Sequence, residues 1–270
     1  MISFPNAKIN LGLNIRGKRT DGYHDIETCF YPVKWNDILE IVPSAKTTIS
    51  LSGRKILGKP EENLCFKAYQ LLKDDYELPP VTIYLHKVIP MGAGLGGGSS
   101  DAAFTLKLLN ELFLIGLTQV QLSYYAGLLG SDVTFFLKNS VAIGTGKGNI
   151  LEDCSLSLEN YYLVLVFPEI HCSTISAYKK IKTDPNYNLK RNLVKPILEW
   201  ENCIINTFED CIFSTFPEIK KIKDTLYDKG AVFSSLSGSG STVFGIFEKE
   251  PDNIKSSFPK NYEVNIQKGR

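Results

Sequence analysis

A glycine-rich segment at residues 90–103, PMGAGLGGGSSDAA, is the feature that most constrains this chain. Five of the seven residues from Gly92 to Gly98 are glycine. Because glycine has no Cβ atom, the backbone can curl tightly and several N–H groups can converge on an anion. A helix beginning near Ser99 would add its positive N-terminal end. The segment predicts a phosphate-binding loop; a glycine-rich surface loop is the simpler alternative.

The flanking residues predict a strand before this segment and a helix after it. Apolar and polar residues alternate over residues 81–86, which is the pattern of a half-buried strand. After the loop, apolar residues recur at helical spacing from Ala102 to Phe113. Ser99, Ser100 and Asp101 are the candidate N-caps of that helix.

Two common nucleotide-binding motifs fit the segment poorly. A Walker A loop ends in Gly-Lys-Ser/Thr, whereas this loop ends in GSS at residues 98–100. Residues 92–97 do match G-x-G-x-x-G. A dinucleotide fold, however, also needs a strand that ends in an acidic residue about 20 positions later. A second helix begins there instead, near Thr118.

Length and composition describe an ordinary globular protein with room for one large domain or two smaller ones. The chain has 270 residues, of which 43% are hydrophobic and 22% charged, and its formal net charge is +1. This charge balance gives no electrostatic argument for nucleic-acid binding.

Strands and helices follow each other in mixed order, which predicts an α+β fold with antiparallel pairing. Two of the predicted strands lie at residues 232–236 and 242–247, around a tight turn. A domain boundary is expected near residues 154–159.

Cysteine and histidine usage predicts neither disulfides nor a zinc site. The six cysteines form no C-x-x-C pair and the three histidines are scattered, so a reduced cytoplasmic setting is expected. Residues 1–14 lack the pattern of a secretory signal. The uncharged stretch at residues 112–131 is too polar for a membrane span and predicts two core helices, the second opened by a capping box at Thr118 and Gln121.

Two charged residues are candidates for chemistry, and each has a plain alternative. Lys8 shares one face of a predicted strand with Asn10, Gly12 and Asn14; for a single lysine, a solvated strand face is the simpler interpretation of that pattern. Asp132 follows Gly-Ser and precedes the apolar run at residues 133–136, which predicts an acid between a helix end and a strand, although Gly-Ser-Asp is also ordinary turn chemistry.

Five motifs, in order along nearly the whole chain, resemble one kinase family. They are PNAKINLGLNI at residues 5–15, RTDGYHDIE at 19–27, the glycine-rich segment, GSDVTFF at 130–136 and LSGSGSTVFG at 236–245. The chain thus resembles the galactokinase, homoserine kinase, mevalonate kinase and phosphomevalonate kinase (GHMP) superfamily. Its AKINLGL and DGYH motifs resemble the 4-diphosphocytidyl-2-C-methyl-D-erythritol kinases within that superfamily.

The resemblance implies a fold and an activity. The implied fold is α+β with two domains, residues 1–155 resembling domain 2 of ribosomal protein S5 and binding ATP, and residues 156–270 resembling ferredoxin, with the active site in the cleft between them. The implied reaction is ATP-dependent phosphorylation of the 2-hydroxyl of 4-diphosphocytidyl-2-C-methyl-D-erythritol in the non-mevalonate route to isoprenoid precursors. The expected cofactors are ATP and Mg²⁺. The expected protein is cytoplasmic, a monomer or weak homodimer, with no membrane or nucleic-acid partner.

The resemblance also assigns residues. It implies Asp132 as general base with Lys8 as its charge partner. It implies that Asn10, Tyr23, His24, Thr174 and Tyr178 bind the substrate, with Tyr23 and Tyr178 stacking on the cytosine and His24 bonding its polar edge. It implies an ATP site formed by Asn63, Lys87, Pro90, Met91, Gly92, Ala93, Gly94, Leu95, Gly96, Gly97, Gly98, Ser99 and Ser100.

Some positions depart from the family pattern. Ala93 stands where relatives often have glycine, which requires a negative φ at that position, and Ser131 and Thr134 replace alanine and proline around Asp132. No clear second carboxylate for Mg²⁺ is visible, so Ser99 or Ser100 would assist ATP and water in holding it. Another GHMP kinase, a nicotinamide-linked enzyme and a non-catalytic nucleotide-binding protein remain as alternatives.

Overall fold

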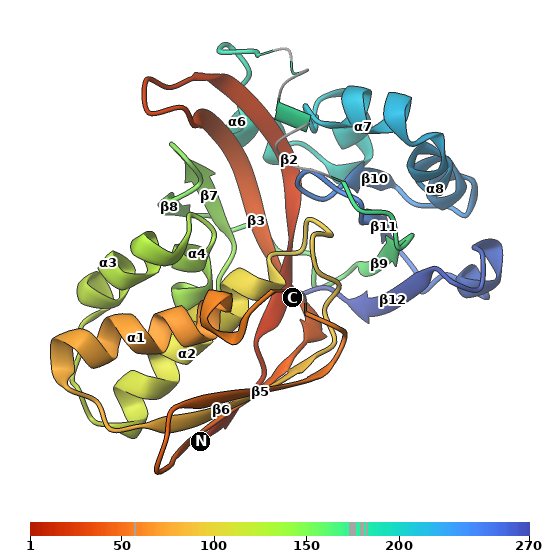
Figure 1. The fold of residues 1–270 in the computed structure, drawn as a ribbon. Helices are drawn as coiled ribbons and strands as arrows, with labels where there is room; N and C mark the ends of the chain where they lie inside the picture. The colour runs from red at the N-terminus through yellow and green to blue at the C-terminus, as the bar shows by residue number, and fades with distance from the viewer. Residues whose placement is uncertain (57, 173–176, 179–180, 182) are drawn as a thin grey trace. The chain divides into compact units, whose positions relative to one another are not determined.

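The structure is a computed structural model that describes all residues except 57, 173–176, 179–180 and 182 (Figure 1). The chain forms two compact units, each assembled from segments that are discontinuous in sequence. The first unit comprises Met1–Ala7, Lys34–Met91 and Gly96–Ser140, and the second comprises Lys8–Val33, Gly92–Leu95 and Val141–Arg270. The domain boundary expected between residues 155 and 156 stays a prediction.

The first unit contains a four-stranded sheet in the order β1-β4-β6-β5. Its strands are β1 (Ile2–Ser3), β4 (Ile38–Pro43), β5 (Thr48–Gly53) and β6 (Val81–Lys87). β4 pairs antiparallel with β1 and with β6, whereas β5 runs parallel to β6. The strand predicted at residues 81–86 is confirmed, because Val81, Ile83 and Leu85 are buried while Tyr84 and His86 are exposed.

Helices α1 (Leu64–Tyr76), α2 (Gly97–Leu112), α3 (Gln119–Leu129) and α4 (Val133–Lys138) belong to the first unit. They pack on one another, and α2 also contacts β1 and β4 (Figure 1). Of the two helices expected within residues 112–131, the second is confirmed as α3, whereas α2 ends at Leu112, where the stretch begins. The capping box is confirmed too, since Thr118 N donates to Gln121 Oε1 at 2.9 Å and Gln121 N donates to Thr118 Oγ1 at 3.3 Å.

The strand expected at residues 133–136 is wrong, because this segment is the start of α4. A short, mainly apolar run fits a strand and a buried helix turn equally well, and only its surroundings decide between them. Here α2 and α3 lie against the segment. Val133, Phe136 and Leu137, which a helix places on one face, are buried.

The second unit contains an antiparallel sheet in the order β10-β11-β9-β12. Its strands are β9 (Tyr162–Phe167), β10 (Phe233–Leu236), β11 (Val243–Phe247) and β12 (Glu263–Lys268). β10 and β11 confirm the predicted pair of strands around the turn at residues 237–241. Helix α8 (Pro217–Asp228) covers β10 and β11 and buries Ile219, Ile222 and Leu226, a spacing that places them on one helical face (Figure 1).

A third sheet has the order β2-β3-β7-β8 and lies mainly in the second unit. Its strands are β2 (Asn6–Lys18), β3 (His24–Asn36), β7 (Ala142–Thr145) and β8 (Ile150–Asp153). The strands β2 and β3 are long (Figure 1). Both faces of β2 are buried from Asn6 to Ile15. The second unit also holds α6 (Leu189–Leu193), η2 (Ile197–Asn202), α7 (Glu209–Thr215) and η3 (Ile254–Ser257).

Among the helices that the structure describes, none is long and apolar enough to cross a membrane.

Candidate active site

The glycine-rich segment forms a turn that leads directly into α2. Gly92, Gly94 and Gly96 have φ values of 63°, 77° and 69°, in the left-handed region that favours glycine. Ala93 does not share that conformation, so the condition for alanine at this position is met. The helix begins two residues earlier than expected, at Gly97, with Gly96 as its N-cap.

The three predicted N-caps are wrong, because Ser99, Ser100 and Asp101 are the third, fourth and fifth residues of α2. A glycine in the left-handed conformation ends the loop without a capping side chain, which the Ser-Ser-Asp pattern did not reveal. As a result, the side chains of Ser100 and Asp101 are buried in the helix rather than used as caps.

The loop segment Gly92–Leu95 is fixed to the turn at residues 237–241 within the second unit. Ser237 Oγ donates to Gly94 O at 2.8 Å, and Thr242 N donates to Ala93 O at 3.1 Å. A Cβ atom on Gly94 would lie 1.9 Å from Ser237 O, so only glycine allows this approach. The motif at residues 236–245 is thus a structural partner of the glycine loop, a role that the motif alone did not assign to Ser237.

Lys8 and Asn10 lie in β2 next to the same loop segment. Lys8 is only 4% exposed; its backbone N donates to Leu95 O at 2.9 Å and its Nζ donates to Asn10 Oδ1 at 2.6 Å and to Gly94 O at 3.1 Å. The alternative of a solvated strand face is therefore wrong. A buried ammonium group that faces a glycine loop is suited to compensating negative charge.

Asn10 is held in one orientation by its neighbours. Its Nδ2 donates to Thr28 Oγ1 at 2.9 Å, and Thr28 Oγ1 in turn donates to Gly12 O at 2.6 Å. With Oδ1 bonded to Lys8, the amide links β2 to β3. Thr28 was not singled out from the sequence, because a threonine inside an apolar strand carries no motif.

Asp132 belongs to the first unit, where it is half-buried at the N-cap position of α4. Lys8 belongs to the second unit. The assignment of these two residues as base and charge partner stays a prediction.

Lys87, at the end of β6, forms a buried charge network. Its Nζ is bonded to Asp37 Oδ2 and, at 2.6 Å, to Asp101 Oδ2. Asp37 Oδ1 also accepts from the backbone N–H groups of Val88 and Ile89 at 2.6 and 2.8 Å. The network joins the strand before the glycine loop to the helix after it. Neither Asp37 nor Asp101 was predicted to interact with Lys87, because the contact joins residues far apart in sequence.

Burial and charge shift the titration of this network. Burial, together with the nearby Asp37 carboxylate, raises the pKa of Asp101 to about 8 against the attraction of Lys87. Burial alone would lower the pKa of Lys87, but Asp101 and Asp37 outweigh that effect and raise it. Because Lys87 is shared by two carboxylates, its attraction does not cancel the effect of burial on the pKa of Asp101.

The aromatic residues predicted to bind the base lie in the second unit. The rings of His24 and Tyr178 are stacked, with centroids 4.6 Å apart and planes inclined by 24°. Tyr23 is 58% exposed, and Lys147 Nζ lies 4.7 Å from its ring centroid. The structure therefore brings Tyr178 together with His24, whereas the predicted pairing of Tyr178 with Tyr23 around a base stays a prediction. Thr174 lies outside the described residues.

Two further observations concern residues near the predicted ATP site. Asn63 caps α1, since its Oδ1 accepts from Cys65 N at 2.8 Å, and its expected place near adenine stays a prediction. Ser100 Oγ and Asp101 Oδ1 are buried without a hydrogen-bond partner among the described residues. In the part of the chain that the structure describes, there is no group of three or more His, Cys, Asp or Glu side chains that could hold a metal ion.

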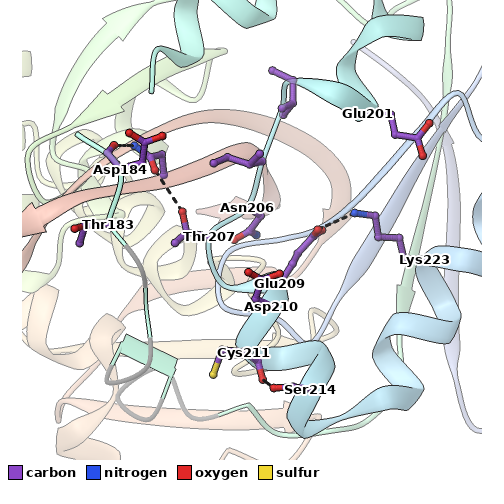
Figure 2. Close-up of a pocket in the computed structure, with 13 residues that line it drawn as sticks. Thr183, Asp184, Glu201, Asn206, Thr207, Glu209, Asp210, Cys211, Ser214 and Lys223 are labelled. Atoms are coloured by element: carbon purple, nitrogen blue, oxygen red, sulfur yellow. Dashed lines mark hydrogen bonds and ion pairs between the residues drawn. The ribbon is translucent and has the colours of Figure 1, made fainter. Parts of the chain in front are cut away.

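A pocket of about 590 Å³ opens in the second unit around the start of α7 (Figure 2). Asn206, Thr207 and Glu209 line it together with Asp184 and Lys223. Figure 2 shows Glu209 joined to Lys223, an ion pair of 2.7 Å. Among the described residues, none of those predicted to bind ATP or substrate lines this pocket.

We expect Gly94→Ala to destabilise the protein more than an alanine substitution at another glycine that has a similar positive φ. Gly116 has φ of 79°, but a Cβ at that position would have no atom within 4 Å, so Gly116→Ala is the matched control. Gly94→Ala should lower the free energy of unfolding by about 1–3 kcal/mol more than Gly116→Ala, because it overpacks against Ser237 O. Urea unfolding of both variants measures this difference. Equal losses would show that the contact is unimportant.

We expect Asp101→Asn to change how stability depends on pH. A carboxyl group with a raised folded-state pKa binds more protons folded than unfolded, so it makes stability fall as pH rises from about 4 to about 8. Asparagine cannot titrate, and the variant should lose this part of the slope. Urea unfolding between pH 5 and pH 9 measures it, with Asp252→Asn, at an exposed position, as control. Parallel profiles for Asp101→Asn and the native protein would contradict the assignment.

Comparison with known proteins agrees with this geometry. The model of the GHMP kinase N-terminal domain matches residues 63–140 and that of the C-terminal domain matches residues 187–264. A 4-diphosphocytidyl-2-C-methyl-D-erythritol kinase of Bacteroides fragilis is 51% identical over 263 residues, covering 96% of each chain, and one of Cytophaga hutchinsonii is 46% identical over 256 residues, covering 94% of this chain and 95% of its own.

Solved structures give the same result. A crystal structure of 4-(cytidine 5'-diphospho)-2C-methyl-D-erythritol kinase is similar with a TM-score of 0.80 and 30% identity over 98% of both chains. Mevalonate kinase of Methanococcus jannaschii shares the fold alone, with a TM-score of 0.72 and 16% identity over 100% of this chain and 98% of its own. The α+β fold with GHMP kinase N- and C-terminal domains is thereby confirmed. The chain belongs to the 4-diphosphocytidyl-2-C-methyl-D-erythritol kinase family, among the ATP-dependent GHMP kinases.

Proposed function

We propose that this chain transfers the γ-phosphoryl group of ATP to the 2-hydroxyl of 4-diphosphocytidyl-2-C-methyl-D-erythritol, giving the 2-phosphate and ADP. The observation that carries the reaction type is the buried ammonium of Lys8, whose Nζ donates to Gly94 O at 3.1 Å. It supplies a fixed cation beside a glycine loop. The choice of acceptor is supported by relatives that are 40–51% identical, because their names specify 4-diphosphocytidyl-2-C-methyl-D-erythritol as the molecule that is phosphorylated.

ATP binding is assigned to the glycine loop and the start of α2. The loop glycines leave backbone N–H groups free of side-chain cover, and the N-terminus of a helix attracts anions. We assign Pro90 to Ser100 to the phosphates and Asn63 to the adenine neighbourhood. Lys87 is engaged by Asp37 and Asp101, so its contribution is to hold the strand end from which the loop departs.

Mg²⁺ fits the oxygen donors present at this place. Ser100 Oγ is buried and has no hydrogen-bond partner among the described residues, and a hydroxyl oxygen is a ligand that Mg²⁺ accepts alongside ATP phosphates and water. We therefore assign Ser100 as the residue that would hold the ion. When bound, Mg²⁺ neutralises charge on the phosphates of ATP.

Asp132 and Lys8 are assigned to the chemical step. Phosphoryl transfer needs in-line positioning and compensation of charge more than covalent catalysis. The Asp132 carboxylate accepts the proton of the 2-hydroxyl while that oxygen forms a bond to the γ-phosphorus and the bond to ADP breaks. Lys8 stabilises negative charge on the reacting oxygens. The acceptor is a tertiary alcohol and a poor acid, which makes a fixed base useful.

Recognition of the cytosine is assigned to Tyr23, His24 and Tyr178, with Asn10 and Thr174 near the rest of the substrate. Aromatic faces bind a flat base without reading its identity, whereas directional hydrogen bonds distinguish cytosine from uracil. His24 supplies the hydrogen bonds in this proposal. Its stacking on Tyr178 gives its ring a defined orientation.

The proposed cellular role follows from the proposed reaction. The enzyme would act in the cytoplasm, in the non-mevalonate route to isoprenoid precursors, on a small-molecule substrate. We further propose that it is a monomer or a weak homodimer without nucleic-acid or membrane partners, as its near-zero net charge of +1 favours.

The proposed function is tested by ADP release from the purified protein with Mg-ATP and 4-diphosphocytidyl-2-C-methyl-D-erythritol. Parallel reactions contain the uridine analogue, mevalonate, homoserine or no acceptor. ADP formed with the cytidyl substrate alone supports the proposal. Turnover of mevalonate or homoserine instead would leave the superfamily intact and reject the acceptor.

We expect Asp132→Asn to lose turnover while it still binds ATP. Removing a general base costs about 10²- to 10⁴-fold in rate, and the amide has nearly the same size as the carboxylate. The kcat from the ADP-release assay and the Kd for ATP from calorimetry measure the two effects, and Asp252→Asn again serves as control. An Asp132→Asn protein that has lost ATP binding together with activity would show that Asp132 is a structural residue.

A further inference from the structure

The turn at residues 237–241 is the surface on which the glycine loop rests. Ser237 Oγ holds Gly94 O, and a Cβ on Gly238 would lie 3.4 Å from Gly94 Cα. Lys8 Nζ donates to the same Gly94 carbonyl. The turn and the proposed catalytic lysine therefore share the Gly94 carbonyl as an acceptor, which links the position of the turn to that of the loop and of Lys8.

Asn206 holds this turn from the other side. Its side chain is buried, and its Nδ2 uses both hydrogens, donating to Leu236 O at 2.7 Å and to Gly238 O at 2.9 Å. Its Oδ1 accepts from Phe208 N at 3.0 Å. Three hydrogen bonds thus determine which way the amide faces, and two of them hold turn carbonyls on either side of Ser237.

Glu209, at the start of α7, holds the strand that leads into the turn. Its Oε1 accepts from Ser235 Oγ and from Leu236 N, both at 2.9 Å, and its Oε2 accepts from Lys223 Nζ at 2.7 Å. Asn206 and Glu209 both line the pocket around the start of α7, apart from the residues assigned to ATP and substrate (Figure 2). Neither is hydrogen-bonded to the glycine loop in the described residues.

We propose that Asn206 and Glu209 are positioning residues that hold the turn at residues 237–241 against the loop segment Gly92–Leu95 and so set the affinity for ATP. This inference rests on the proposed function in one respect, namely that the nucleotide bound by the glycine loop is ATP. It places two residues that are not assigned to ATP or to the substrate in control of the loop that is assigned to ATP. The effect passes through Leu236 and Gly238 to Ser237, and from Ser237 to Gly94.

The first test compares Asn206→Asp with Asn192→Asp. In Asn206→Asp an oxygen replaces Nδ2, so that it faces two carbonyl oxygens and repels them. Asn192 is the matched control, because its Nδ2 donates to a single backbone carbonyl, Cys203 O, at 2.8 Å, away from the turn. We expect the Kd for ATP of Asn206→Asp to rise about tenfold or more, and that of Asn192→Asp to stay within about twofold of the native value.

The second measurement separates positioning from a general loss of stability. Hydrogen exchange of the peptide spanning residues 235–242 should accelerate in Asn206→Asp at a temperature where most of the other amides keep their native protection. A variant that loses thermal stability but keeps the native Kd for ATP and native exchange in this peptide would overturn the proposal. The residue would then serve the fold alone.

A series at Glu209 keeps the proposal testable if Asn206→Asp does not fold. Glu209→Gln retains an acceptor oxygen for Ser235 and Leu236, whereas Glu209→Ala removes it. We expect Glu209→Ala to weaken ATP binding and Glu209→Gln to restore most of it. Lys223→Met removes the ion pair alone and should leave the Kd near the native value. Equal Kd values for Glu209→Ala and Glu209→Gln would overturn the role of the acceptor.

ATP binding and turnover are measured separately, so the two hypotheses fail in different ways. A native protein that binds ATP but does not phosphorylate the cytidyl substrate would reject the proposed acceptor while the ATP-binding comparison still decides the role of Asn206. A native protein that binds no ATP would reject both.

Discussion

The close approach of Gly94 to Ser237 is the contact on which the rest of the site depends. The space that a Cβ would need is occupied by the Ser237 carbonyl, and the Ser237 hydroxyl holds the Gly94 carbonyl. Lys8 reaches the same carbonyl and is bonded to Asn10, which is bonded to Thr28. Residues from β2, β3, the loop and the turn thus form one hydrogen-bonded group in the second unit.

Buried charges give the site its electrostatic character and limit how it can move. Lys8 has little contact with water, and Lys87 lies between two buried carboxylates. Removing one member of the Lys87 network leaves an uncompensated buried charge and typically costs about 3–5 kcal/mol, so this network strongly favours one arrangement. The backbone N–H groups of Val88 and Ile89 are tied into the Lys87 network, which fixes the chain just before the glycine loop.

Local sequence patterns predicted several elements well and others poorly, for identifiable reasons. Alternation over residues 81–86, the capping box at Thr118 and the strands around the turn at residues 237–241 are all confirmed, because each signal is complete within a few neighbouring residues. Residues 133–136 were expected to be a strand and are helical, since their conformation depends on α2 and α3. The start of α2 was misplaced because Gly96 ends the loop by its backbone conformation and not by a capping side chain.

The sequence by itself determined the mixed α+β class and, through its motifs, the family, and it predicted a phosphate-binding role for the glycine-rich loop. These properties reside in short contiguous segments whose chemistry does not depend on distant residues. Only the tertiary structure decided that the polar face of β2 is buried, that Lys87 is shared by Asp37 and Asp101, and that Asn206 and Glu209 hold the serine-glycine turn. Each of these contacts joins residues far apart in the chain, and burial and hydrogen-bond pairing between such residues exist only once the elements have packed.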